Sequence, residues 1–217
     1  MAHVVLIGDS ILDNGAYVGR GGDVASTLQA RLAEDKVTLL ARDGAVIEGA
    51  QSQLKGVPQD ATLLVISAGG NDALRSVGIL AEPARTVADG LAKVLTIRER
   101  FSEQYRALLD QAQSFDPPSA ICTIYDVLLP NLEQRKLANL ALGVLNDVIT
   151  REAARRGLPL IDLRVMFTQE QHFANAIEPS EQGSELIAAA VVEAMGHRYS
   201  GPSAIYTGRL AAGAHNG

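Results

Sequence analysis

Short apolar runs recur along the chain, and each is separated from the next by a longer stretch of helix-forming residues. The runs are too short for good helices and almost continuously apolar, which is typical of strands buried on both faces of a sheet. They cover residues 4–7, 37–40, 63–67, 120–125 and 158–161. Because strands that alternate with helices form right-handed βαβ units, the pattern predicts an α/β protein, a three-layer α/β/α sandwich with about five parallel strands.

The stretches between these runs predict the helical layers. Apolar residues recur with helical spacing over residues 23–33, 86–113, 133–156 and 181–195, and Ser180 is a suitable N-cap for the last helix. We expect one domain over residues 1–198. The segment 199–217 is rich in Gly and Ala and has little helical period, so we predict a flexible tail or a contact with a neighbouring subunit.

Composition narrows the classes of partner and cofactor. The chain has 217 residues, 19 of them basic and scattered, and a net charge of −6, so nucleic acid is not an expected partner. The single cysteine, Cys122, allows no internal disulfide, and no Cys/His cluster indicates a metal or other cofactor. The start of the chain does not read as a secretory signal, and no stretch approaches the ~18 apolar residues of a membrane span. We therefore expect a cytoplasmic protein that does not bind membranes.

Polar residues follow three of the predicted strands, at the sheet edge where α/β proteins bind ligands. The first loop contains Gly8, Asp9 and Ser10. A serine directly after a buried strand can present its hydroxyl to the cleft as a nucleophile, and its N–H lies near the start of a helical turn. The alternative from the residues alone is that Ser10 caps that turn.

The second and third loops offer groups that suit an oxyanion. Gly44 follows the second run, and a glycine there lets a backbone N–H approach a ligand closely. Asn71 and Asp72 follow Gly69-Gly70 after the third run. The Asn71 amide is a preorganised donor, and Asp72 is suited to anchor the loop through backbone hydrogen bonds.

Together the three loops resemble blocks I, II and III of the SGNH (GDSL) hydrolases over nearly the whole domain. The matching residues are Gly8-Asp9-Ser10, then Gly44, then Gly69-x-Asn71-Asp72. The resemblance implies a flavodoxin-like five-stranded parallel sheet with Ser10 as the nucleophile. It also implies an oxyanion hole formed by the Ser10 N–H, the Gly44 N–H and the Asn71 side chain.

The fourth block of the family departs from its pattern in this chain. That block is Asp-x-x-His before the last helix, where His is the general base and Asp orients it. Asn175 stands at the Asp position and Glu178 at the His position, followed by Pro179-Ser180. Of the four histidines, only His172 lies in the same loop, and its other interpretation is an exposed loop histidine.

Three mechanisms remain open from the sequence. Glu178 takes the Ser10 proton itself, which requires burial to raise its pKa from an ordinary value near 4.3. Alternatively, His172 is the base and Glu178 orients it. In the third, the chain has lost hydrolysis and keeps the cleft for ligand binding.

We expect a serine ester hydrolase that acts on small acyl or acetyl esters, with a small-molecule ester as its partner. The alternative is a catalytically impaired ligand-binding protein on the same scaffold. A receiver-like signalling domain is disfavoured. Asp9, Asp43 and Asp72 offer an acidic pocket, but no lysine at the last strand completes that set.

Overall fold

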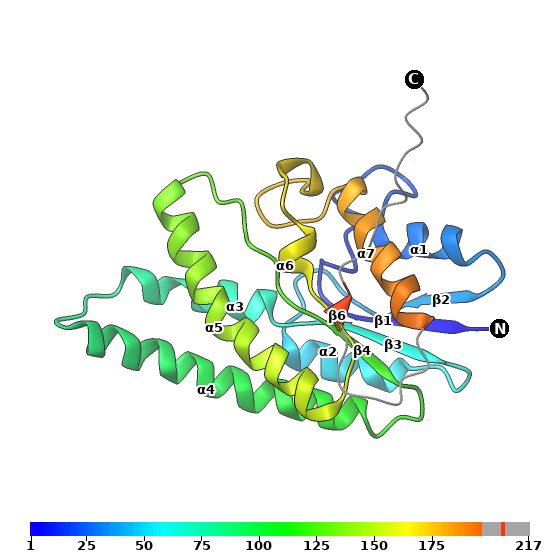
Figure 1. Ribbon diagram of the computed structural model, residues 1–217, viewed down its shortest axis with the longest axis horizontal. Coiled ribbons are helices and arrows are strands. Elements are labelled where there is room, and N and C mark those ends of the chain that lie inside the picture. Colours follow the sequence, from blue (N-terminus) through cyan, green and yellow to red (C-terminus); the bar gives the residue numbers. More distant parts are fainter. Residues whose placement is uncertain (197–204, 207–217) are drawn as a thin grey trace.

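One parallel sheet forms the centre of the molecule. The computed structural model describes residues 1–196 and the two-residue strand 205–206, and its strand order is β2-β1-β3-β4-β5-β6 (Figure 1). The strands are β1 (His3–Gly8), β2 (Lys36–Leu39), β3 (Leu63–Ser67), β4 (Ser119–Cys122), β5 (Leu160–Ile161) and β6 (Ile205–Tyr206), all paired in parallel. The predicted parallel sheet is therefore confirmed. β6 extends it by one short strand within the segment expected to be a tail, and the rest of that tail, beyond residue 198, lies outside the described residues.

Helices cover both faces of the sheet. They are α1 (Val24–Leu32), α2 (Ile47–Gln53), α3 (Gly70–Ser76), α4 (Val87–Ala112), α5 (Leu132–Arg156), α6 (Leu163–Met166) and α7 (Glu181–Met195), with short 3-10 helices η1 (Leu54–Gly56), η2 (Val77–Ala81) and η3 (Glu170–His172). Successive side chains of β1 point to opposite faces, as the pleat requires. Val4 and Leu6 belong to a cluster with α1, α6 and α7, whereas Val5 and Ile7 belong to one with α2, α4 and α5.

The long helices begin and end close to their predicted bounds because their ends are capped. Thr86 and Asp89 form a reciprocal capping box at the start of α4. The side chain of Asn131 caps α5, which ends at Gly157 in the left-handed conformation. Ser180 accepts a hydrogen bond from the Gly183 N–H at the start of α7, which confirms it as the N-cap.

β4 is shorter than the predicted run because two asparagines of α5 take up the backbone that follows it. The Asn146 side chain accepts from the Ile124 N–H at 2.8 Å and donates to the Ile124 carbonyl at 2.7 Å. Asn139 pairs in the same way with Val127, at 2.8 and 3.2 Å. These bonds replace the ladder of a strand, so residues 124–129 leave the sheet and run along α5.

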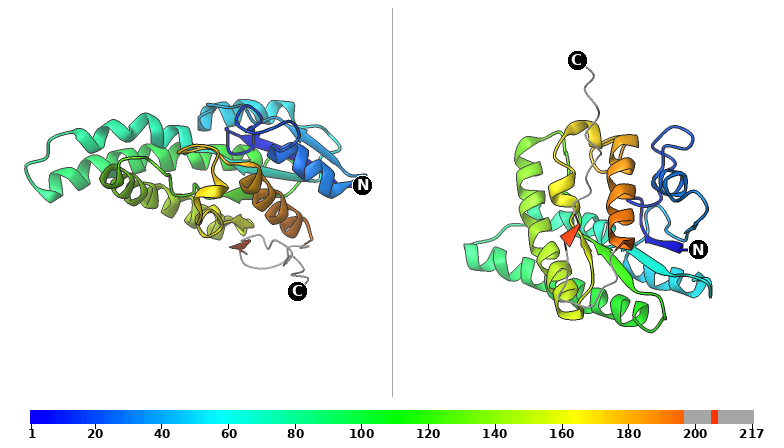
Figure 2. Two further views of the ribbon diagram at one scale, coloured as in Figure 1. Left: turned by 90° about the horizontal axis from the view of Figure 1, so that it is seen from above. Right: turned by 45° about the vertical axis from the view of Figure 1, so that its right-hand side comes forward.

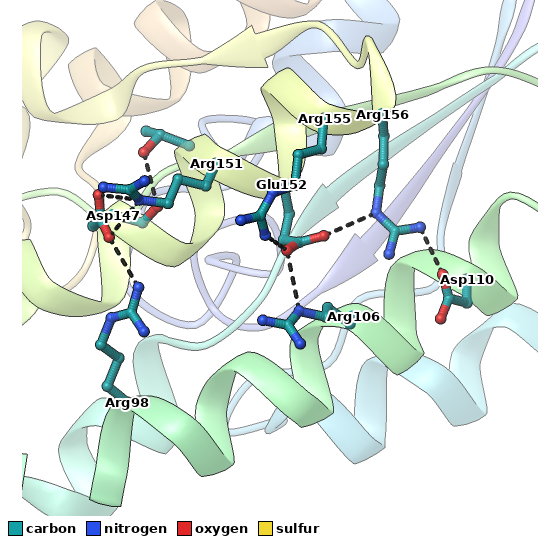
Figure 3. A network of polar contacts seen from close by, with 9 residues as sticks. Arg98, Arg106, Asp110, Asp147, Arg151, Glu152, Arg155 and Arg156 are labelled. Carbon is teal, nitrogen blue, oxygen red and sulfur yellow. Dashed lines mark hydrogen bonds and ion pairs between the residues drawn. The ribbon is translucent and has the colours of Figure 1, made fainter. Parts of the chain in front are cut away.

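The N-terminal halves of α4 and α5 extend past the carboxyl ends of the strands (Figures 1 and 2). Nearer their other ends, a network of ion pairs joins the two helices (Figure 3). Its centre is the buried Glu152, which accepts from Arg106, Arg155 and Arg156 at 2.8–3.2 Å. The arginine-rich end of α5, which could pass for a merely solvated surface, therefore fixes that helix to α4.

Neither a membrane-spanning helix nor a metal site is found within the described residues. None of the helices there combines the length and hydropathy needed to cross a bilayer. The described part of the chain also contains no group of three His, Cys, Asp or Glu side chains able to hold a metal ion. Cys122 is buried, and burial raises the pKa of its thiol far above the ordinary value.

Candidate active site

The turn after β1 leaves Ser10 free for chemistry. Gly8 has φ +140°, and a Cβ there would lie 1.7 Å from the Ser67 carbonyl oxygen, so only glycine allows β1 to end against β3. The capping of the following turn is done by Asp9, whose Oδ1 accepts from the Ile11 N–H at 3.2 Å. The Ser10 hydroxyl is therefore not the cap. The backbone N–H of Ser10 donates to no acceptor among the described residues.

Three of the predicted site residues line one pocket. Ser10, Asn71 and Glu178 share it, although they come from the loops after β1 and β3 and from the segment before α7. Most of the remaining wall is apolar, and no residue in it is basic. The topology therefore brings together the nucleophile candidate, an amide donor and a carboxylate.

The Glu178 carboxyl group is buried beside Ser10. Its residue is 5% exposed, and its Oε2 atom has no hydrogen-bond partner within the described residues. Burial raises the pKa of Glu178 to about 7, against the opposing effect of a hydrogen bond with the Ser10 side chain. The nearby charge of Asp43 raises the pKa further. Near neutral pH this carboxyl group can both take up and release a proton.

Asp9 is a second carboxyl group on the same pocket. It is 2% exposed, and its Oδ2 atom has no partner in the described part of the chain. Burial raises the pKa of Asp9 to about 7 although the Ile11 N–H lowers it, and the charges of Glu178 and Asp72 add to the rise. Asp9 is therefore a second buried carboxyl group whose charged form is disfavoured beside Ser10.

Asn175, at the position of the family's aspartate, shapes the turn that presents Glu178. Its Oδ1 accepts from the N–H groups of Ile177 at 2.9 Å and Glu178 at 3.0 Å. The Glu178 carbonyl accepts from the Ala174 N–H at 2.8 Å and closes the turn. Asn175 therefore holds the backbone of the carboxylate residue, and no hydrogen bond joins the two side chains.

Asn14 ties this turn to the nucleophile loop. It is fully buried, and its amide nitrogen donates to the Pro179 carbonyl at 3.2 Å and to the Ser184 hydroxyl at 2.8 Å. Its oxygen accepts from the Val24 N–H at 3.0 Å. One side chain thus links the loop that holds Ser10, the start of α1 and the residue after Glu178.

The second and third loops are joined to each other at the edge of the pocket. The Asn71 amide donates to the Ala45 carbonyl at 3.0 Å, and the Asp72 carboxylate accepts from the Ile47 N–H at 3.0 Å. Gly44 has φ +74° and open space where a Cβ would lie. Its N–H donates to no acceptor among the described residues. Gly44 is not itself part of the pocket wall, but Ala45, bonded to Asn71, follows it directly.

His172 lies elsewhere. It is 8% exposed, packs edge-on against Phe167 with ring centroids 6.0 Å apart, and is absent from the pocket wall. Burial lowers the pKa of its imidazole, although the Met166 backbone opposes this. Its carbonyl is held by the Ser180 N–H at 2.9 Å, and a Cβ on Gly183 would lie 2.3 Å from that oxygen. The histidine is a packed core residue rather than the exposed loop residue of the alternative interpretation.

A family model matches most of the chain. The model of the GDSL-like lipase/acylhydrolase family covers residues 6–186, from β1 into α7. The chain belongs to this family. No curated protein matches it significantly.

Several solved structures have the same fold. A lipolytic G-D-S-L family protein from Veillonella parvula DSM 2008 aligns with a TM-score of 0.67 and 17% identity, over 89% of this chain and 97% of the other. The extracellular lipase of Streptomyces rimosus aligns with a TM-score of 0.67 and 17% identity, over 85% and 95%. The acetyl xylan esterase AlAXEase aligns with a TM-score of 0.62 and 18% identity, over 89% and 97%. At these identities the likeness establishes the fold.

Sequence reasoning missed two features of this site. One is the part that Asn14 plays in joining the loops, and the other is the raised pKa of Asp9. Both lie within five residues of Ser10, but their surroundings come from segments far away in the chain. Asn14 bonds to residues 165 and 170 positions later. The only local signal is that polar side chains follow a buried strand directly, which marks the loop without showing which of them become buried.

Proposed function

We propose that this GDSL-family chain is a serine ester hydrolase in which Ser10 is the nucleophile and Glu178 is the general base. The observation that carries the proposal is the pairing of the Ser10 hydroxyl with a buried carboxylate in a pocket with no basic side chain. Glu178 thereby takes the place that histidine holds in the usual triad.

The raised pKa of Glu178 removes the main objection to a carboxylate base. A glutamate with an ordinary pKa near 4.3 accepts a proton from a serine hydroxyl poorly. A general base works best when its pKa lies near the working pH. Burial brings the pKa of Glu178 to about 7. This value is similar to that of an ordinary histidine, ~6.5.

The oxyanion donors proposed are the N–H groups of Ser10 and Gly44 and the amide of Asn71. Both N–H groups lack acceptors in the described residues, so they are available to a developing negative charge. Asn71 uses one of its two amide hydrogens on Ala45 and keeps the other. Preorganised donors of this kind are each worth about 10²–10³-fold in rate.

The proposed reaction has two halves. In the first, the Ser10 oxygen bonds to the ester carbonyl carbon, its proton passes to Glu178, and the carbon–oxygen bond to the alcohol breaks as Glu178 returns that proton to the alcohol. In the second, water gives a proton to Glu178 and its oxygen attacks the acyl group. The bond to Ser10 then breaks, and Ser10 recovers the proton while the acid leaves.

The other mechanisms have less support. A His172 base would have to leave its packing against Phe167 and cross to a pocket that it does not line. A ligand-binding protein on the same scaffold would have no need of a serine left free of capping beside a carboxylate of raised pKa.

For the substrate, the chain length of the acyl group is the open question. Small acyl or acetyl esters are the expectation from the sequence and stay a prediction. The names of the similar structures include lipases and an acetyl xylan esterase, so the shared fold favours neither class.

A fluorophosphonate probe tests the nucleophile, and hydrolysis of p-nitrophenyl acetate and butyrate tests the reaction. We expect the wild type to be labelled at Ser10, located by mass spectrometry of peptides, and to lose both labelling and hydrolysis in Ser10→Ala. Ser26→Ala, which changes a serine outside the pocket wall, is the matched control.

The results separate the two functions. Labelling at Ser10 with turnover above the Ser10→Ala background supports the hydrolase. A folded protein that is neither labelled nor faster than Ser10→Ala is a ligand-binding protein, and the proposed hydrolase is then wrong.

A further inference from the structure

The pocket beside Ser10 is far more apolar and more extended than an acetyl group requires. Its wall has few polar residues, and Asp9, Ser10 and Glu178 are among them. Beyond them the walls are aliphatic and come from α3 and η2, the N-terminal half of α4, the middle of α5 and residues 124–129 after β4. They include Leu74 and Leu80, Val94 and Ile97 of α4, and Ala141 of α5.

This pocket has a polar end and an open apolar end. Three of its lining residues are more than a third exposed, Leu74 at 40%, Val77 at 46% and Leu80 at 37%, so the pocket opens to solvent beside α3 and η2. The two helices that supply part of the wall also carry apolar side chains outside it, with Leu91 63% exposed on α4 and Leu140 73% exposed on α5.

The wall runs outward from the nucleophile for some distance. On α5 the lining residues extend from Ala138 to Leu145, two turns of helix and about 10 Å of length. On α4 they include Val94 and Ile97. Val94, Ile97 and residues 138–142 belong to the N-terminal halves of the two helices, and these halves extend past the strand ends in Figures 1 and 2.

We propose that this pocket binds the acyl chain of the substrate and selects esters of medium- to long-chain linear fatty acids. This inference rests on the proposed function, since it places the acyl carbonyl at Ser10 with its chain directed away from the sheet. A polar or charged acyl group would lose its hydrogen bonds with water and find none along the aliphatic wall. A flexible alkyl chain loses nothing of that kind and is removed from water.

The alcohol part of the ester takes the other side of Glu178. Asp43 lies near enough to raise the pKa of Glu178, and it accepts a hydrogen bond of 2.7 Å from the exposed Tyr17 hydroxyl. That flank is polar and acidic, whereas the α4–α5 side is aliphatic. The two flanks of the nucleophile thus have opposite character, which fixes the direction in which the ester lies.

Ala141 is a position at which a larger side chain can shorten the accessible length. It lies on α5 in the pocket wall and is only half-buried. Its side chain is a single methyl group, and a larger one there would extend into the pocket rather than into the main core. Phenylalanine there would fill the pocket beyond its polar end. The same substitution at Ala154, on the same helix but exposed and outside the pocket, is the matched control.

Two ester series on the full chain test the chain assignment. In the first, p-nitrophenyl acetate, butyrate, octanoate and laurate vary the acyl chain; in the second, acetates of butanol and octanol vary the alcohol. We expect kcat/KM to rise along the first series by about fourfold for each methylene until the pocket is full, the equivalent of about 0.8 kcal/mol. The second series stays flat. A profile that is flat or falls from acetate onward overturns the inference, as does a rise in the alcohol series alone.

The variants locate the effect. Ala141→Phe should lower kcat/KM for octanoate and laurate by at least tenfold more than it lowers kcat/KM for acetate, while Ala154→Phe keeps the wild-type profile. If Ala141→Phe does not fold, Val94→Phe makes the same obstruction from α4. Equal profiles in wild type and a folded pocket variant contradict the assignment of the pocket.

A binding measurement separates this inference from the proposed function. Ser10→Ala has no nucleophile, so calorimetry can follow its titration with the uncharged ester methyl octanoate, compared with methyl acetate and with Ser10→Ala/Ala141→Phe. Binding of methyl octanoate that the second substitution weakens by more than tenfold supports the acyl pocket even if no ester is hydrolysed. Hydrolysis of p-nitrophenyl acetate by the wild type without any binding of methyl octanoate leaves the hydrolase intact and overturns the pocket.

Discussion

Two buried glutamates, Glu152 and Glu178, show what surroundings do to one side chain. They are 3% and 5% exposed, and burial alone would raise the pKa of either carboxyl group. Glu152 lies between α4 and α5 against three arginines, whose hydrogen bonds outweigh burial and lower its pKa (Figure 3). Glu178 has no basic neighbour in its pocket, and its pKa rises to about 7.

The difference separates a structural carboxylate from a reactive one. Glu152 stays ionised and saturated with donors, so it holds two helices together and has no free oxygen to offer. Glu178 retains an oxygen with no partner in the described chain and a proton affinity in the neutral range. Perturbed pKa values of the second kind are typical of catalytic sites.

Replacing each glutamate by glutamine is the strongest way to break this comparison. Glu178→Gln keeps the shape but cannot accept the Ser10 proton, so we expect ester hydrolysis to fall by about 10³-fold or more. Glu152→Gln leaves three arginines with a neutral partner. Because those arginines are partly exposed, we expect a loss of about 2 kcal/mol in the free energy of unfolding. Its kcat/KM stays within about twofold of wild type.

Steady-state kinetics and urea unfolding on the two variants measure both quantities. If Glu178→Gln keeps wild-type activity, Glu178 is not the base. If Glu152→Gln loses activity while it stays folded, the role of Glu152 is not purely structural and the comparison fails.

The same two residues should give opposite dependences of stability on pH. The pKa of Glu178 rises from 4.5 to about 7 on folding, so between those values the folded chain keeps a proton that the unfolded chain releases. Stability therefore falls as pH rises through this window, by about 2 kcal/mol once solvent at the pocket mouth is allowed for. Asp9 contributes in the same direction.

Glu152 acts at the other end of the pH scale. Its pKa is lowered from 4.5, so its stabilising contribution is present above that value and is lost as pH falls through the lower, folded value. Urea unfolding from pH 3 to 8 should show Glu178→Gln with a shallower decline between pH 4.5 and 7, and Glu152→Gln with a shallower loss below pH 4.5. Parallel curves for all three proteins would show that neither pKa shift exists.

Asn14 sharpens the comparison because it positions the reactive carboxylate. Asn14→Ala removes the bonds to Pro179 and Ser184, so Glu178 is held less firmly against Ser10. We expect kcat to fall about tenfold with little change in KM, together with a loss of about 1–3 kcal/mol in stability from unsatisfied buried groups.

Asn131→Ala is the control for Asn14. Asn131 caps the exposed start of α5, so its loss should cost about 1 kcal/mol of stability and leave kcat unchanged. Equal effects of the two variants on kcat would mean that Asn14 acts through stability alone.

The sequence predicts the strands, helices and loops that build this site better than it predicts the chemistry of the site. Buried parallel strands, capped helices and the loops with Ser10, Gly44 and Asn71 follow from local patterns, because periodicity and turn chemistry are local. Two features of the chemistry depend on contacts between distant segments. The pKa of Glu178 depends on what lies around it in space, and the burial of His172 depends on α7 packing over it through Gly183. Such contacts leave no periodic trace in the chain.

His172 provides the prediction with the smallest expected effect. Its ring is buried against Phe167, its Nδ1 has no partner in the described residues, and burial keeps it neutral. His172→Leu removes an imidazole with one unpartnered nitrogen and also removes its hydrogen bond with the Met166 backbone. The apolar leucine is of similar size, so we expect stability within about 1 kcal/mol of wild type. The plot of kcat/KM against pH should keep its height and its rise near pH 7, because the rise belongs to the Glu178 carboxyl group. A folded His172→Leu that has lost its activity would show that His172 is the general base, and Glu178 would then orient it rather than act as the base itself.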